Sequence, residues 1–192
     1  VNTDGFIFDP TSRSFNVSDI ATIINDLKKD YTVIIMSEFQ FDTGESKHVH
    51  AIPQVPDIRL WAGIIQCADH FLGCDSVGQH IARAMDTTAT VVTGATFPIN
   101  ITYPNEKSFD IFDMGEGTRT YSPLRMTGED MQDMENDECM TMTKDDVKKV
   151  IDSCRKRLGK PTTRKIVKQE PTQEKESCCD DPYCPTSTVK TP

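Results

Sequence analysis

The feature that most constrains the fold is the alternation of short, almost wholly apolar runs with amphipathic helical segments. The apolar runs include Tyr31–Met36 (YTVIIM), Phe71–Gly73 (FLG) and Ala89–Thr93 (ATVVT). A strand that is apolar on both faces needs a cover on both faces, and strands joined by helices run parallel. The first hundred residues therefore predict an α/β fold, a single Rossmann-like parallel sheet domain with helices on both faces.

The helical segments are recognised by their apolar spacing and by their caps. Ser18 precedes a segment with four large aliphatic residues on one face, and Asp57 can cap a second segment. A third helix is predicted over Val77–Met85, and Thr143 can cap a closing helix with cations in its last turn. A short strand is predicted at Gly5–Asp9.

Composition divides the chain into three parts. Residues 1–105 carry the strand and helix alternation and are predicted to form the core. Residues 106–158 are predicted to be an acidic connector, rich in Met and Gly, followed by the closing helix. Residues 159–192 consist mainly of Pro, Thr, Lys and Glu, which cannot bury a core, so this tail is predicted to be disordered.

The charge balance excludes some classes of protein. The 192 residues carry a formal net charge of −9, whereas a nucleic-acid-binding domain needs a basic patch. No apolar run approaches the roughly 20 residues that cross a bilayer, and no signal peptide is recognisable. Seven cysteines, an odd number, are expected to be reduced, which predicts a cytoplasmic protein. Val1 stands in place of Met, which is compatible with a fragment whose upstream part is missing.

A polar junction follows the apolar run at Phe71–Gly73. Residues 73–80 (GCDSVGQH) lead from a predicted strand into a helix, where free N–H groups and the helix dipole favour an anionic ligand. Gly78 would let a phosphate approach the backbone, and Ser76 and His80 can donate to the same ligand. In the alternative interpretation, Asp75 or Ser76 only caps the helix and His80 is a half-buried structural residue.

The segment GCDSVGQHIARAMDTTATVVTGATFPINITYP, residues 73–104, resembles the sugar-nucleotide-binding half of glycosyltransferase family 9, the ADP-heptose:lipopolysaccharide heptosyltransferases and their relatives. That family has a strand, the run G-x-D-S/T-G-x-x-H-L-A-A-A, a second strand and F-G-P/A-T. The matching residues are Gly73, Asp75, Ser76, His80, Ile81–Ala84, Gly94–Thr96 and Pro98. Asp9–Arg13 (DPTSR) resembles the Thr-Thr-Arg-type loop of the family, and the likeness covers roughly residues 3–158.

The resemblance implies the C-terminal half of a GT-B arrangement and a metal-independent, inverting sugar transfer in lipopolysaccharide biosynthesis. The donor would be a nucleotide-sugar such as ADP-heptose, with no further cofactor, and the acceptor a glycan or glycolipid. The nucleotide-sugar-binding residues that it implies are Thr11, Ser12, Arg13, Asp75, Ser76, Val77, Gly78, His80 and Thr96. The acceptor domain of the family, with its catalytic carboxylate, would lie upstream, so no catalytic residue is assigned here.

The chain departs from the family pattern at two places. Val77 stands where the family has a glycine, with Gly78 one place later, and the phosphate-binding lysine that the family has shortly after its Thr-Thr-Arg-type loop has no counterpart. Two other functions stay open, a non-catalytic nucleotide(-sugar)-binding module and a structural or interaction domain without ligand. Neither His48 and His50 nor the cysteines of residues 178–184 have the ligand spacing of a metal site, so no metal is predicted.

Overall fold

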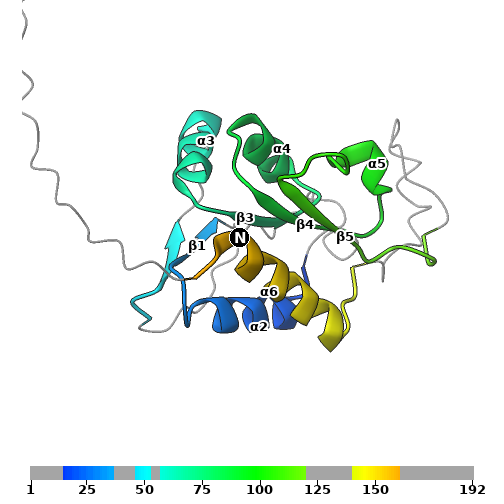
Figure 1. Ribbon diagram of the computed structural model, residues 1–192, viewed down its shortest axis with the longest axis horizontal. Coiled ribbons are helices and arrows are strands. Elements are labelled where there is room, and N and C mark those ends of the chain that lie inside the picture. The colour runs from blue at the N-terminus through cyan, green and yellow to red at the C-terminus, as the bar shows by residue number, and fades with distance from the viewer. Residues whose placement is uncertain (1–14, 37–45, 53–56, 120–139, 161–192) are drawn as a thin grey trace, which may run out of the picture. The chain divides into compact units, whose positions relative to one another are not determined.

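The computed structural model of the chain describes residues 15–36, 46–52, 57–119 and 140–160, all within one compact unit, Val1–Pro161 (Figure 1). The predicted strand at Gly5–Asp9 and nearly all of the predicted tail lie outside these residues. In chain order the elements are α2 (Val17–Leu27), β1 (Val33–Met36), β2 (Val49–Ile52), α3 (Ile58–Cys67), β3 (Phe71–Cys74), α4 (Val77–Ala84), β4 (Ala89–Thr93), α5 (Pro98–Ile101), β5 (Phe109–Asp113) and α6 (Lys144–Leu158).

The described strands form two parallel sheets. Strand β1 pairs with β2, and β4 lies between β3 and β5 in a sheet of three strands. Phe71 of β3 is level with Ala89 of β4, which is level with Phe109 of β5. The prediction of an α/β fold with parallel strands is confirmed, whereas the described strands lie in two sheets and not in one.

Helices cover both faces of the strands (Figure 1). One core lies among α2, α6 and strands of both sheets, and it includes Ile23 of α2, Val33 of β1, Val92 of β4 and Val150 of α6. A second core joins Met36 of β1 to residues of α3, α4 and the three-stranded sheet. Because each core takes side chains from both sheets, the two sheets share the same two layers of helices.

Three helices begin with side-chain caps that explain where they start. The Asp57 carboxylate accepts the Arg59 N–H at 2.8 Å at the start of α3, and Thr143 forms a capping box with Asp146 at the start of α6. Both caps were predicted. The cap of α2 is Asn16 rather than Ser18, because the Asn16 side chain accepts the Ser18 N–H at 3.0 Å.

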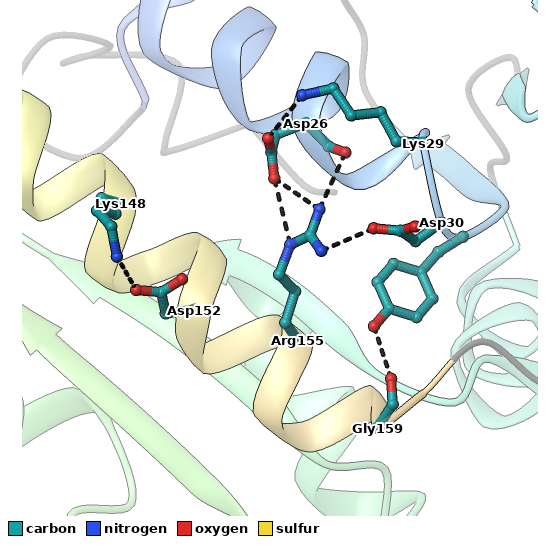
Figure 2. A network of polar contacts seen from close by, with 8 residues as sticks. Asp26, Lys29, Asp30, Lys148, Asp152, Arg155 and Gly159 are labelled. Atoms are coloured by element: carbon teal, nitrogen blue, oxygen red, sulfur yellow. Dashed lines mark hydrogen bonds and ion pairs between the residues drawn. The ribbon is translucent and has the colours of Figure 1, made fainter.

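Polar contacts join α6 to α2 (Figure 2). The Arg155 guanidinium lies 2.9 Å from Asp26 Oδ1 and 2.7 Å from Asp30 Oδ2, and the Tyr31 hydroxyl donates to the Gly159 carbonyl at 2.7 Å. The closing helix α6 therefore packs in the same hydrophobic core as α2 and is also joined to the end of α2 by ion pairs at the surface. Of the helices in the described ranges, none combines the length and apolar character that crossing a membrane requires.

Strand β5 lies where the sequence predicts only an acidic connector. Its sequence FDIFD contains two aspartates that would be costly in a sheet if they were unpaired. Each has an arginine partner: Asp110 lies 2.5 Å from Arg157, and Asp113 lies 2.6 Å from Arg119. The arginines come from elsewhere in the chain, so the local pattern does not reveal a strand.

Candidate functional site

The carboxyl ends of β3, β4 and β5 lie along one edge of the three-stranded sheet. The strands are parallel and in register, so the segments that follow them, residues 75–78, 94–97 and 113–119, lie at the same edge. We call these three segments the carboxyl edge. In open α/β sheets ligands bind outside the carboxyl ends of the strands, which makes this edge the first place to look for a site.

The first segment of the carboxyl edge turns from β3 into α4. Ser76 is the N-cap residue with extended backbone (φ −151°, ψ 170°), and its side chain makes no capping hydrogen bond. Gly78 in the first turn is buried, whereas Val77 is 45% exposed. The valine that replaces the glycine of the family pattern therefore does not fill the buried side of the turn.

Two buried polar side chains lie in this turn. Asp75, only 7% exposed, accepts a hydrogen bond from Gln79 Nε2 at 3.5 Å. Gln79 is fully buried, and its Oε1 has no hydrogen-bond partner among the described residues. A buried carbonyl oxygen without a partner costs about 1–3 kcal/mol. One polar atom of the turn therefore has no partner among the described residues, and Gln79 is a candidate site residue that was not predicted from the sequence.

The second segment contains Thr96, which is buried, and it is fixed by an arginine from the third. Arg119 is 2% exposed at its side chain and donates from Nη1 to the carbonyls of Gly94 and Thr96, the latter at 3.1 Å. The same guanidinium lies 4.3 Å from the centroid of the Phe97 ring. Arg119 was not predicted as a site residue, because its local signal is a lone cation after a glycine-rich turn.

Asp113 holds this guanidinium at the end of β5. Its two carboxylate oxygens accept from Arg119 Nη1 at 2.8 Å and from Nη2 at 2.6 Å. Oδ1 also accepts the N–H of Gly115 at 3.1 Å. One carboxylate therefore organises both the arginine and the turn that follows β5.

His80 is turned toward the segment between α5 and β5. Its Nδ1 lies 2.9 Å from the Tyr103 hydroxyl, and the two rings meet edge to face with centroids 5.7 Å apart. Arg83, one turn further along α4, pairs with Glu106 at 2.8 Å. His80 therefore belongs to a polar cluster on the outer side of α4, and its contacts in the structure are not with the other predicted site residues.

The remaining predictions divide by position. The structure brings Asp75, Ser76, Val77, Gly78 and Thr96 to the carboxyl edge, whereas Thr11, Ser12 and Arg13 lie outside the described residues. Within the described ranges, no group of three or more His, Cys, Asp or Glu side chains could hold a metal ion. His48 and His50 lie at the start of β2 and just inside it, and the cysteines of residues 178–184 are not described.

A second polar cluster lies at the amino ends of the same strands. His70 Nε2 lies 2.9 Å from Thr90 Oγ1, Thr90 lies 2.9 Å from Ser153 Oγ of α6, and Ser153 donates to Asp110 at 2.8 Å. Because an ionised carboxylate only accepts, Ser153 must donate to it, Thr90 to Ser153 and Nε2–H to Thr90. The single proton of the Thr88 hydroxyl lies within reach of both Nδ1 at 2.8 Å and the Asp69 carbonyl at 3.2 Å. The order of donors from His70 to Asp110 favours the Nε2–H tautomer of neutral His70.

The charges at the amino end agree with this assignment. Burial lowers the pKa of His70 to about 4, and the positive charge of Arg157 acts in the same direction. Hydrogen bonds from Arg157 to Asp110 hold the pKa of that carboxyl below its ordinary value. The amino-end cluster is therefore a closed set in which each polar group satisfies its neighbour.

Comparison of the chain with protein-family models, with curated proteins and with solved structures found no match to any of them. What the structure defines is the class, an α/β protein with parallel strands between two layers of helices.

Proposed function

We propose that this chain is the donor nucleotide-sugar-binding half of a metal-independent, inverting glycosyltransferase that resembles family 9. The proposal includes a single Rossmann-like sheet, to which the strands of both described sheets would belong. The two hydrophobic cores support this, since each contains side chains from both sheets.

The observation that carries the proposal is the turn from β3 into α4. It combines a helix N-terminus with no side-chain cap hydrogen bond, a buried glycine and the unsatisfied oxygen of Gln79. The first-turn N–H groups suit the oxygens of a diphosphate. A ribose or sugar hydroxyl could donate to Gln79 Oε1, which would supply the partner that this atom otherwise lacks.

The chemistry of transfer explains why several groups must converge. As the glycosidic bond to the diphosphate breaks, negative charge grows on the leaving group, and N–H groups and hydroxyls must stabilise it if no metal does. A helix terminus contributes about 0.3–2 kcal/mol. In this proposal the diphosphate is bound by the Ser76 side chain, by the amides of Val77 and Gly78, and by Thr96. Asp75 orients the turn. Thr11, Ser12 and Arg13 are expected to add to this binding, and His80 would have to leave Tyr103 to take part in it.

A second candidate is a nucleotide-binding module that does not catalyse transfer. It is favoured because two carboxylates at the carboxyl edge already have partners: Asp75 accepts a hydrogen bond from Gln79, and Asp113 forms an ion pair with Arg119. A carboxylate held in this way is poorly placed to act as a general base. Transfer in the first candidate would need a base from the upstream acceptor domain, which would also bring the glycan or glycolipid acceptor.

The experiment that tests the site is a calorimetric titration of ADP-glucose and GDP-mannose into the chain and into its Ser76→Asp variant. Aspartate is as good an N-cap as serine and favours the helix dipole, so the free energy of unfolding should stay equal or rise by up to about 1 kcal/mol. The same carboxylate would repel a diphosphate, so affinity should fall by about tenfold or more.

The matched control is Gln66→Glu, which adds the same charge at the exposed carboxyl-terminal end of α3. It should leave the affinity within about twofold. Equal affinities for the wild type and Ser76→Asp, or no binding of either nucleotide-sugar by the wild type, would contradict the proposed site. Assays of hydrolysis or transfer of the bound nucleotide-sugar then separate the enzyme from the binding module.

A further inference from the structure

The side chain of Arg119 connects two segments of the carboxyl edge that are separated along the chain. Its Nη1 donates to the carbonyls of Gly94 and Thr96 in the segment after β4, and both Nη atoms pair with Asp113 at the end of β5. The Phe97 ring lies against the same guanidinium, 4.3 Å from its centre. All of these contacts are made at a side chain that is 2% exposed.

The geometry of the guanidinium suits this connection. A planar guanidinium presents its N–H donors in a fixed fork, so that Nη1 and Nη2 together meet the Asp113 carboxylate. The two Nη1 hydrogens are shared among Asp113 and the carbonyls of Gly94 and Thr96, and Nε has no partner among the described residues. A lysine at the same position would offer one point of attachment. The positive charge of Arg119 is already neutralised by Asp113, which leaves it suited to hold a loop rather than to bind an anionic ligand itself.

Gly115 shows how closely the two segments approach. A Cβ atom added there would collide with the Gly94 carbonyl oxygen and lie 2.7 Å from Arg119 Nη1. The Gly115 N–H is also bound to Asp113. The turn after β5 is therefore pressed against the segment after β4, and the approach requires a residue without a side chain.

We propose that Arg119 is a positioning residue that fixes residues 94–97 against the end of β5 and thereby places Thr96 at the nucleotide-sugar site. The inference rests on the proposed function for its ligand, but the fixing of the loop does not. Arg119 acts through the backbone of residues 94–96 and makes no contact with the donor in this proposal. Asp113 serves the same role by holding the guanidinium in its orientation.

The strand that carries Asp113 also offers a matched control. Asp110 lies three residues earlier on β5 and makes an equivalent paired contact with Arg157, accepting from Nε at 2.8 Å and from Nη2 at 2.5 Å. This second pair lies at the amino end of the strand. Asp113→Asn and Asp110→Asn therefore remove the same charge from the same strand and from the same kind of ion pair, at opposite ends.

The experiment measures two quantities on both variants: amide hydrogen exchange over residues 94–97, and affinity for ADP-glucose and GDP-mannose by calorimetry. Asp113→Asn should raise exchange in this segment and weaken affinity by about tenfold, the effect of losing about one hydrogen bond to the loop. Asp110→Asn should leave the affinity within about twofold and the exchange in this segment unchanged, whatever it does to the melting temperature.

A second pair of variants covers the case in which Asp113→Asn does not fold. Gly115→Ala should raise exchange over residues 94–97, because its Cβ would press on Gly94 and Arg119. Gly63→Ala in α3, where nothing lies within 4 Å of the new Cβ, should not.

Each outcome decides a separate question. Equal effects of Asp113→Asn and Asp110→Asn on both readouts would overturn the positioning role. Raised exchange with unchanged affinity would show that Arg119 fixes the loop but does not place a ligand group, which also overturns the inference. If the wild type binds neither nucleotide-sugar, the proposed function fails, and exchange alone decides whether Arg119 holds the segment.

Discussion

The two ends of the three-stranded sheet use polar side chains in opposite ways. At the amino end, His70, Thr90, Ser153 and Asp110 form a continuous chain of hydrogen bonds in which each donor has an acceptor. At the carboxyl end, the Ser76 side chain makes no capping hydrogen bond to α4, and Gln79 Oε1 has no partner among the described residues. The described polar groups at the amino end therefore satisfy one another, whereas the carboxyl end, where the proposed ligand would bind, keeps a buried oxygen without a partner.

The largest effect is expected from a substitution in the middle of the amino-end cluster. Thr90→Val keeps the shape of the side chain but leaves His70 Nε2 and Ser153 without their shared partner, so the free energy of unfolding should fall by about 2–3 kcal/mol. Thr93→Val is the control on the same strand, because Thr93 makes one long bond, to the Phe112 carbonyl at 3.4 Å. Its free energy of unfolding, measured by urea unfolding, should fall by about 1 kcal/mol or less. Similar losses of stability in the two variants would contradict the difference between the two ends of the sheet.

The next effect is a pH dependence that originates at His70. Its pKa of about 4 in the folded protein lies below the ordinary 6.5, so the unfolded chain binds the proton more tightly. The free energy of unfolding should be unaffected by His70 above pH 6.5 and should fall by about 1–3 kcal/mol as the pH is lowered from 6.5 to 4.

His70→Gln should remove this pH dependence, and urea unfolding at several pH values measures it. The carboxyl of Asp110, whose pKa is lowered, loses its contribution only below its ordinary pKa of 3.8, outside this window. An unchanged slope between pH 6.5 and 4 in His70→Gln would show that His70 is not buried in its neutral form.

The smallest expected effect is at the carboxyl end. Gln79→Met keeps the volume, removes the unsatisfied oxygen and gives up only the 3.5 Å bond to Asp75, so the free energy of unfolding should change by less than about 1 kcal/mol. The affinity for ADP-glucose should fall if a donor hydroxyl binds Oε1. A stability loss as large as that of Thr90→Val would mean that Gln79 serves the fold and not a site.

The parts of the fold that could be predicted are those that depend on local sequence patterns. The apolar runs predicted β1, β3 and β4, and Asp57 and Thr143 were recognised as caps because a capping residue acts within three residues of itself. Asp75, Ser76 and Gly78 were predicted from the junction of a strand with a helix, whereas Val77 and Thr96 were predicted only from the family resemblance. Whether they bind a ligand stays a prediction.

What the sequence could not reveal depends on partners distant in the chain. Strand β5 has the sequence of an acidic segment until Asp110 is seen against Arg157, 47 residues later. The role of Arg119 can be inferred only because the folded chain brings residues 94–96 next to it. The tautomer of His70 can be inferred only because the Ser153 hydroxyl of α6 contacts Thr90. A local pattern contains the charge of each residue but not the group that balances it.

Helix α6 is the last described element of the chain, yet it supplies Val150 and Cys154 to the core that α2 and β1 also share. A ribosome making this protein would release α2 and the first two described strands long before α6 exists to cover them. Burial of that core must therefore wait until about residue 158 has left the exit tunnel, and nascent chains stalled earlier would be the ones that need a chaperone.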